Sequence, residues 1–264
     1  MLGLDFGKTD LLISLWNEES TCAEIYNIFG VKGDEAVPSM VIYSEDGRLL
    51  IGKEAVEYSL KTQTSGITAL YGQKEGEEVE LNGMKKTVEE LLSAYLDSVF
   101  SVIRRRYGGA LIARIGITGE RLSESEKERL TKVFERIGYS KEKLYFSTHA
   151  DAFLWYELCE GVAGSDTVKN QAAMALDYDS KGLLCYLLHP AEEDRGIPYY
   201  LETADYSELM SGGLASIWQE EERYGCFSRM TELALGRKDA ARLYVTGLHV
   251  ETPQAAEVLQ QFSR

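Results

Sequence analysis

Residues 2–10, Leu-Gly-Leu-Asp-Phe-Gly-Lys-Thr-Asp, decide how this chain is expected to fold. A short apolar run ends around Asp5 and is followed by Gly7, and residues 11–16 form a second apolar run with the length and composition of a strand. The pattern predicts a hairpin with a tight turn at residues 7–10. Such a turn can aim backbone N–H groups at an anion, and an acidic residue at the end of the first strand suits a hydrated magnesium ion. An ordinary hairpin with a turn aspartate fits the same residues.

Residues 4–10 resemble the first phosphate loop of the superfamily that contains actin, hexokinase and the seventy-kilodalton heat-shock chaperones. Residues 37–43 and 46–55 favour the chaperone branch. They are similar to its segment of threonine-proline-serine, strand, turn and valine-glycine-x-x-alanine, in the same order and spacing. Residues 115–119 and the elements after them resemble the connecting region of that family. The resemblance covers most of residues 1–160.

The predicted elements occur in an order that is repeated along the chain. The first set has strands at 2–6, 11–16 and 23–29, helix 88–106, strand 110–118, helix 123–137, strand 143–146 and helix 150–160. The second set has strands at 172–177, 183–189 and 198–203, a helical region at 206–235, strand 241–246 and helix 253–262. Both sets begin with three strands and continue with alternating helices and strands.

The resemblance implies that these two sets are the halves of a duplicated actin-like, ribonuclease H-like α/β fold. We therefore expect lobe I over residues 1–160, with an insertion at about 31–86, and lobe II over residues 171–264. In the superfamily the two lobes face each other across a nucleotide cleft, which Asp5 and Asp177 would line here. Lobe II lacks the last strand and helix of the pattern, so we expect either a longer natural chain or a truncated family member.

Two helices carry signals of their own. Ser123, followed three residues later by Glu126, is a capping-box arrangement that predicts the start of a helix. The helix at 88–106 has a wide apolar stripe and ends in three arginines, which suit the negative end of the helix dipole or an anion. The stripe consists of Leu91, Leu92, Tyr95, Leu96, Val99, Phe100 and Ile103.

The resemblance also implies a nucleotide site for ATP or ADP with magnesium. Asp5 and Asp177 would orient the hydrated metal ion. Gly7, Lys8 and Thr9 would contact phosphate. Gly247, in the sequence Leu-Tyr-Val-Thr-Gly-Leu at 243–248, would lie near the base or the ribose.

Several residues depart from the pattern of the family. Side chains stand at 178–181 where the chaperones have glycines after the second aspartate, and Asp179 adds a negative charge beside phosphate. Thr148 stands where the chaperones have a glutamate that places the attacking water, and His149 and Asp151 are the nearest titratable substitutes. Gly247 follows Asp177 by only 70 residues, so the outer subdomain is expected to be reduced.

These departures predict a binding or regulatory module with weak or no ATP hydrolysis. A divergent ATPase or small-molecule kinase of the same superfamily is the first alternative, although we identify no second acidic residue at a substrate-base position. An interaction scaffold that uses the lobes without nucleotide is the second. A protein partner, or a region beyond residue 264, would complete the function.

Composition and charge limit the class of protein and the partners that the sequence allows. The chain has 264 residues, of which 44% are hydrophobic and 10% aromatic, as in a globular protein. Its formal net charge of -15 disfavours nucleic acid and anionic lipid as partners. With no targeting leader and no long apolar run, the sequence predicts a cytoplasmic protein. The histidines (His149, His189, His249) and the cysteines (Cys22, Cys159, Cys185, Cys226) are scattered, which predicts individual surface or loop histidines rather than a metal cluster, and reduced, mostly buried thiols.

Overall fold

The protein is described by a computed structural model, which covers residues 1–7, 10–28, 35–108, 112–119, 122–163, 172–178, 183–190, 199–206, 231–232, 236, 242–247 and 260. The chain forms two compact units, Met1–His149 (unit 1) and Ala150–Arg264 (unit 2). Both units combine helices with mixed or antiparallel strands, so the fold class is α/β, as the sequence predicts.

Unit 1 contains the strands β1 (Leu2–Phe6), β2 (Asp10–Asn17), β3 (Cys22–Ile25), β4 (Val37–Pro38), β5 (Met40–Tyr43), β6 (Leu49–Ile51), β7 (Ile67–Thr68), β8 (Glu78–Leu81), β9 (Met84–Thr87), β10 (Ile115–Gly119) and β11 (Leu144–Thr148). Its helices are α1 (Gly52–Thr62), α2 (Val88–Tyr107) and α3 (Glu124–Arg136), with short 3-10 turns at Leu70–Gly72 and Lys141–Lys143. Helix α4 (His149–Ala163) leads into unit 2, which contains β12 (Ala173–Tyr178), β13 (Leu183–Pro190), β14 (Tyr199–Asp205) and β15 (Arg242–Gly247).

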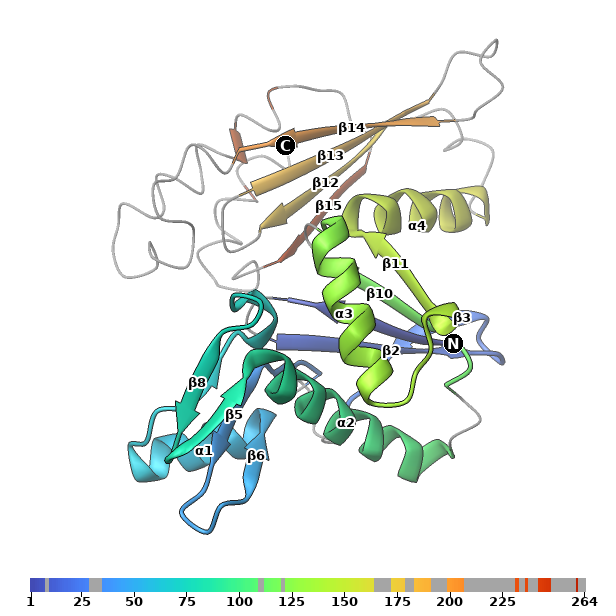
Figure 1. Cartoon of the computed structure of the whole chain (residues 1–264). Helices are drawn as coiled ribbons and strands as arrows, with labels where there is room; N and C mark the ends of the chain where they lie inside the picture. Colours follow the sequence, from blue (N-terminus) through green and yellow to red (C-terminus); the bar gives the residue numbers. More distant parts are fainter. Residues whose placement is uncertain are drawn as a thin grey trace. The chain divides into compact units, whose positions relative to one another are not determined.

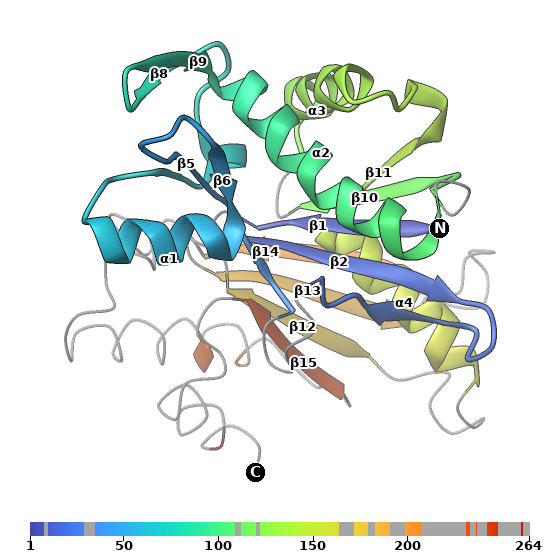
Figure 2. The ribbon, with the colours of Figure 1, turned by 90° about the horizontal axis from the view of Figure 1, so that it is seen from below.

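The main sheet of unit 1 has the strand order β11-β10-β1-β2-β3, and β4 pairs with β2. Strands β1, β10 and β11 run parallel, whereas β2 is antiparallel to both β1 and β3. Helices α2 and α3 lie on one face of this sheet (Figures 1 and 2). Leu2, Leu4 and Phe6 of β1 are at most 3% exposed in the core that these helices cover. The period of two along a strand therefore turns Asp5 to the opposite face.

The two helices begin where their capping residues predict. Ser123 and Glu126 form a complete capping box at the start of α3, which confirms the prediction from the sequence. Thr87 and Glu90 form another at the start of α2. Each box satisfies two backbone donors that the first turn of a helix leaves open. Every residue of the predicted apolar stripe on α2 is at most 1% exposed, so this stripe is the core-facing side of the helix.

The segment between β3 and α2 adds smaller elements to unit 1. Strands β6, β5 and β7 form a sheet that packs with α1 around Met40, Ile42, Leu50 and Ala55. Strands β8 and β9 form a hairpin whose turn, Asn82-Gly83, has positive φ angles of 49° and 76°. Asn-Gly at this place is the usual sequence of a two-residue hairpin turn.

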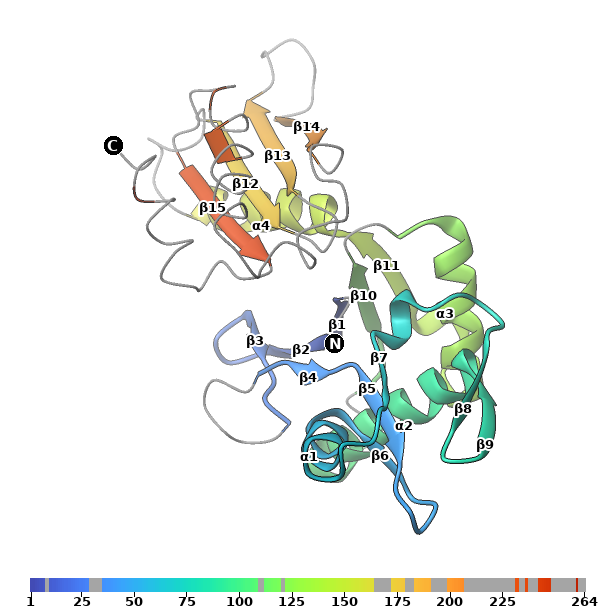
Figure 3. The same ribbon diagram turned by 90° about the vertical axis from the view of Figure 1, so that its left-hand side faces the viewer.

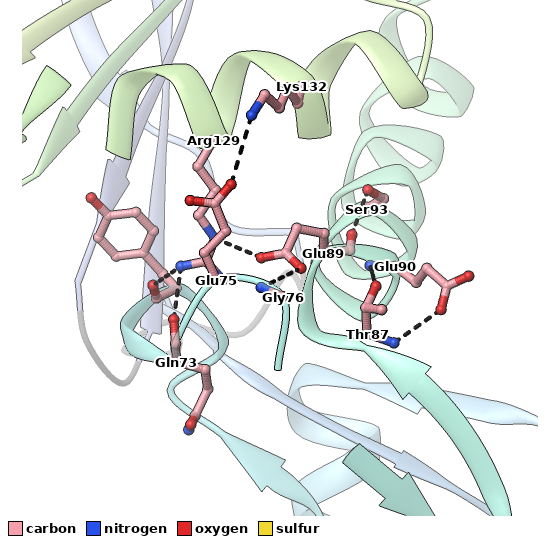
Figure 4. Close-up of polar contacts among 10 residues, drawn as sticks. Gln73, Glu75, Gly76, Thr87, Glu89, Glu90, Ser93, Arg129 and Lys132 are labelled. Atoms are coloured by element: carbon pink, nitrogen blue, oxygen red, sulfur yellow. Dashed lines mark hydrogen bonds and ion pairs between the residues drawn. The ribbon is translucent and has the colours of Figure 1, made fainter. Parts of the chain in front are cut away.

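A buried ion pair fixes this segment to α2 and α3 (Figure 4). The Arg129 side chain, 7% exposed, donates from Nε to Glu89 Oε1 over 2.9 Å. Its Nη1 donates to the carbonyl oxygens of Tyr71 and Gln73 over 3.1 and 2.8 Å. Glu89 Oε2 accepts from the backbone N–H of Gly76 over 3.2 Å. The turn at 71–76 is thus held by side chains of both helices.

The sheet of unit 2 has the same order and direction as four strands of the main sheet of unit 1. Its order is β14-β13-β12-β15, with β12 and β15 parallel and the other neighbours antiparallel (Figures 1 and 3). This is the order and direction of β3-β2-β1-β10. Helix α4 packs on the sheet of unit 2 through Phe153, whose ring lies 5.7 Å from that of Tyr244 and 6.5 Å from that of Tyr186.

Some predicted boundaries need correction. The strand expected at 110–118 is formed only by 115–119, and the strand expected at 23–29 is formed by 22–25. The predicted helical region 206–235 and the helix 253–262 fall almost entirely outside the described residues. The division into lobes 1–160 and 171–264, the reduced outer subdomains, the missing last strand and helix, and the cleft lined by Asp5 and Asp177 stay predictions.

Candidate functional site

The candidate site lies at the carboxyl ends of the parallel strands of unit 1. Asp5 is near the end of β1, Thr118 is near the end of β10, and His149 follows directly after β11. Parallel strands bring their carboxyl ends to the same sheet edge, which is where ligands of open α/β sheets usually bind. Asp5 and Thr118 are direct partners in the register of β1 and β10.

Asp5 is the centre of a polar cluster. The Thr118 hydroxyl lies 3.1 Å from Asp5 Oδ1 and donates to it, and the His149 Nε2 atom lies 2.8 Å from the same oxygen. The Asp5 side chain is 36% exposed and that of His149 is 21% exposed. Asp5 therefore presents an oriented, partly exposed carboxylate, and carboxylate oxygen is a ligand that Mg²⁺ accepts.

The predicted phosphate loop is described only at its ends. A Cβ atom added to Gly7 would lie 2.7 Å from Asp10 Oδ1 and 3.2 Å from the carbonyl oxygen of Asp10. The close approach of Asp10 therefore favours glycine at position 7, which is a structural reason for this residue beside its predicted contact with phosphate. Lys8 and Thr9 lie outside the described residues.

Asp177 occupies the equivalent place on β12, in different surroundings. It pairs in register with Thr246 of β15, as Asp5 pairs with Thr118 of β10. Asp177 is only 2% exposed, and its Oδ2 accepts a hydrogen bond of 3.3 Å from the hydroxyl of Tyr186. The same sheet face carries Ala175, against which helix α4 packs. The side chain of Asp177 is thus enclosed where that of Asp5 is accessible.

Gly247 is explained by the pairing of β15 with β12. Its φ angle is +102°, and an added Cβ atom would lie 2.2 Å from the carbonyl oxygen of Tyr178, its register partner. Glycine is required on both counts. Gly119 has the equivalent place on β10 beside Phe6, where an added Cβ would make only ordinary contacts with Leu122 at 3.4 Å. The predicted role of Gly247 beside a base or ribose stays a prediction.

The segment after Asp177, where the resemblance implies a second phosphate loop, begins in a buried position. Tyr178, where the chaperones have an apolar residue followed by glycines, is fully buried, and its hydroxyl lies 2.5 Å from that of Thr231. Burial raises the pKa of the Tyr178 phenol above its usual range. Residues 179–182, which include Asp179 and Lys181, lie outside the described part of the chain.

Sequence reasoning missed the contact between His149 and Asp5. His149 begins α4 and His189 lies on β13, so neither is in a loop, but both side chains are partly exposed, at 21% and 26%. His189 pairs with Glu202 over 3.3 Å. The signal was available, because strands 110–118 and 143–146 were predicted and parallel strands converge at their carboxyl ends. His249 is not among the described residues, which nowhere group three or more His, Cys, Asp or Glu side chains as a metal site.

Two of the four cysteines can be compared with the expectation of buried thiols. Cys185 on β13 is buried and Cys22 at the start of β3 is partly exposed. The side chains of Cys159 and Cys226 lie outside the described set. In the part of the chain that the structure describes, no helix has both the length and the apolar character to cross a membrane.

Comparison with known proteins places the chain in a family. No curated protein sequence matches it. The model of the C-terminal part of a family of unknown function, DUF5716, matches residues 30–264, which is most of the chain and includes Thr118, His149 and both strands β12 and β15. The matched region begins after β1 and β2, so Asp5 and Gly7 precede it. The chain therefore belongs to the family of unknown function DUF5716, in its C-terminal part.

Proposed function

We propose that the protein is a nucleotide-binding module of the actin and heat-shock chaperone type with a degenerate site, which binds ATP or ADP with magnesium weakly and hydrolyses ATP slowly or not at all. The observation that carries this proposal is the repeated topology. Two sheets share the order and direction of four strands. In each, an aspartate (on β1 or β12) is in register with a threonine of the parallel neighbour (β10 or β15). A duplicated actin-like fold has this design.

The first sheet would supply the metal side of the site. Asp5 is half exposed and oriented by Thr118, so it can hold magnesium through water. Gly7 would leave the backbone accessible to phosphate, and Lys8 and Thr9 would add a cation and a hydroxyl, as the sequence predicts. Bound magnesium would neutralise phosphate charge, while these residues would position the anion.

Slow hydrolysis follows from the residues at the end of β11. Thr148 ends this strand at the place where a chaperone has its glutamate, and a hydroxyl cannot act as a carboxylate base. His149, the nearest substitute, has Nε2 at 2.8 Å from Asp5, so that atom is engaged with the carboxylate. Phosphoryl transfer depends on positioning and charge neutralisation, so the loss of a positioned base lowers the rate strongly.

The enclosed environment of Asp177 favours a second candidate function. A carboxylate that is 2% exposed and bonded to Tyr186 can serve the fold alone. If Asp5 has the same purely structural role, the protein is a scaffold that recognises a protein partner without nucleotide.

Thermal shift with magnesium-ADP and magnesium-ATP separates the two functions. Ligand at 100 times its Kd stabilises the native state by about 2.7 kcal/mol, so even a Kd of about 0.1 mM gives a clear shift at about 10 mM nucleotide. The proposal predicts a concentration-dependent rise in Tm for the wild type, a reduced rise for Asp5→Asn, and an unchanged rise for Asp97→Asn. Asp97 is a matched control, because it is a surface carboxylate of unit 1 whose partner is Arg104. A flat response of the wild type supports the scaffold.

Phosphate release under the same conditions tests the second half of the proposal. We expect turnover far below the ordinary range of about 1 per second or faster. Turnover within that range, abolished by Asp5→Asn, would show an active ATPase or kinase.

A further inference from the structure

The pairing of His149 with Asp5 brings a nitrogen ligand to the proposed metal site. The His149 Nε2 and Asp5 Oδ1 atoms are 2.8 Å apart, and both side chains are partly open to solvent. The superfamily resemblance assigns no such nitrogen to this position, and the proposed function uses only the oxygen of Asp5.

We propose that Asp5 and His149 together bind one divalent transition-metal ion, of the class of Co²⁺, Ni²⁺ and Zn²⁺, in preference to Mg²⁺. Imidazole nitrogen binds these ions well, whereas Mg²⁺ prefers oxygen ligands and retains its water. The nucleotide-bound form of this site rests on the proposed function, but the ion itself needs only these two side chains, water and a vacant coordination position.

The separation of the two atoms fits a shared ion. Two ligand atoms that lie about 2.1 Å from one ion at a right angle are about 3 Å apart. The observed 2.8 Å is close to this separation, but such an ion lies about 45° off the line that joins the two atoms. Both side chains therefore turn toward the ion when it replaces the proton that the two atoms share.

Neighbouring structure holds both ligands in place. The Thr118 hydroxyl bonds to Asp5 Oδ1 and so orients the carboxylate from the adjacent strand. His149 is the first residue of α4 and follows β11 without a loop, so its backbone is fixed by a strand and a helix. Supporting contacts of this kind typically change metal affinity by 10- to 100-fold when they are removed.

The chain offers a matched control in unit 2. His189 and Glu202 also form an imidazole–carboxylate pair, with Nε2 at 3.3 Å from Oε2 and side chains 26% and 50% exposed. This pair lies on the antiparallel strands β13 and β14 rather than at the carboxyl ends of parallel strands. Removing His189 therefore deletes an equivalent imidazole outside the proposed site.

Isothermal titration of the untagged full chain with Co²⁺ alone, and then in the presence of excess Mg²⁺, tests the inference. We expect Co²⁺ binding that a 100-fold excess of Mg²⁺ does not abolish. His149→Ala and Asp5→Asn should each weaken Co²⁺ binding at least tenfold, and His189→Ala should leave it within twofold of the wild type. Visible absorption of bound Co²⁺ should change with His149→Ala and stay unchanged with His189→Ala. Circular dichroism checks that each variant is folded.

The inference is overturned if the wild type binds no Co²⁺, if His149→Ala binds it as the wild type does, or if His189→Ala weakens binding equally. Failure of the proposed function gives a different result. Free Co²⁺ then binds the chain, but neither magnesium-nucleotide nor cobalt-nucleotide does. Failure of the inference alone leaves magnesium-nucleotide binding intact, with no effect of His149→Ala on the choice of metal.

Discussion

Asp5 in unit 1 and Asp177 in unit 2 hold the same place in two sheets that share the order and direction of four strands, yet their surroundings differ. Asp5 on β1 is in register with Thr118 of β10, and Asp177 on β12 is in register with Thr246 of β15. The side chain of Asp5 is 36% exposed and close to Thr118 and His149, whereas Asp177 is 2% exposed and bonded to Tyr186. Sheet topology alone therefore does not decide whether a carboxylate at a strand end is available to a ligand.

The difference has a structural cause in the strands beside each aspartate. In unit 2 a tyrosine on β13 reaches the carboxylate, and helix α4 covers the sheet face through Phe153. In unit 1 the neighbouring β2 places Leu12 in register with Asp5, and the polar contacts come instead from β10 and the residue after β11. The residues around the strand, rather than the strand itself, make one end accessible and the other enclosed.

The largest expected loss of stability concerns the segment between β3 and α2 of unit 1, which has no counterpart among the described residues of unit 2. Arg129→Met removes one partner of the buried pair with Glu89 and two bonds to the turn at 71–76 (Figure 4). Breaking a buried ion pair in this way typically costs about 3–5 kcal/mol. Hydrogen exchange should become faster in α2 and α3 and stay unchanged in β12 and β13.

Lys132→Met is the control for this change. Its ion pair with Glu75 spans 3.7 Å between side chains that are 65% and 48% exposed, so its loss should cost less than about 1 kcal/mol. Equal effects of the two variants would show that the Arg129 network does not hold the segment.

The second prediction compares the glycines that end β15 and β10, Gly247 and Gly119. Gly247→Ala places a Cβ atom 2.2 Å from the carbonyl oxygen of Tyr178 at a φ of +102°, so we expect destabilisation of about 3 kcal/mol. Gly119→Ala makes contacts of ordinary length, with Leu122 at 3.4 Å and the carbonyl oxygen of Phe6 at 3.6 Å, and should cost less than about 1 kcal/mol. Urea unfolding measures both. A mild Gly247→Ala would mean that β15 pairs with β12 in another register.

The third prediction compares the aspartates in the absence of ligand. Asp177→Ala leaves the hydroxyl of Tyr186, in a buried side chain, without this partner and should cost about 1–3 kcal/mol. Asp5→Ala should cost less than about 1 kcal/mol, because its carboxylate is partly hydrated in the native state. The loss of unfolding free energy in each variant is measured from its urea midpoint at a constant m-value, and the two losses are compared. A larger cost for Asp5→Ala would reverse the assignment of the structural aspartate.

Much of the fold could be predicted from local patterns. The strands near 2–6, 11–16 and 183–189 and the helices at 88–106 and 123–137 follow from apolar periodicity and caps, which act within a few residues. The hairpin at 78–87 could have been predicted from Asn82-Gly83 and was overlooked. Boundaries such as the start of β10 at Ile115 were less predictable, because strand ends depend on pairing with distant residues.

The candidate site was less predictable than the fold. Asp5 and Asp177 look alike in sequence, each following a leucine and preceding an aromatic residue. Their burial depends on Tyr186 and on the packing of α4, and these contacts arise from sheet register and tertiary packing. His149 was placed next to a strand end by the sequence, but its partner, 144 residues earlier, emerges only when β1, β10 and β11 align.

Calorimetric titration of magnesium-ADP into the wild type, Asp5→Asn and Asp177→Asn tests the central claim, that the accessible aspartate binds the ligand and the enclosed one supports the fold. Far-ultraviolet circular dichroism confirms that each variant is folded at the titration temperature. We predict weak binding to the wild type, at least tenfold weaker binding to Asp5→Asn, and binding to folded Asp177→Asn within about threefold of the wild type. Unchanged binding to Asp5→Asn, together with its loss in Asp177→Asn, would contradict the account.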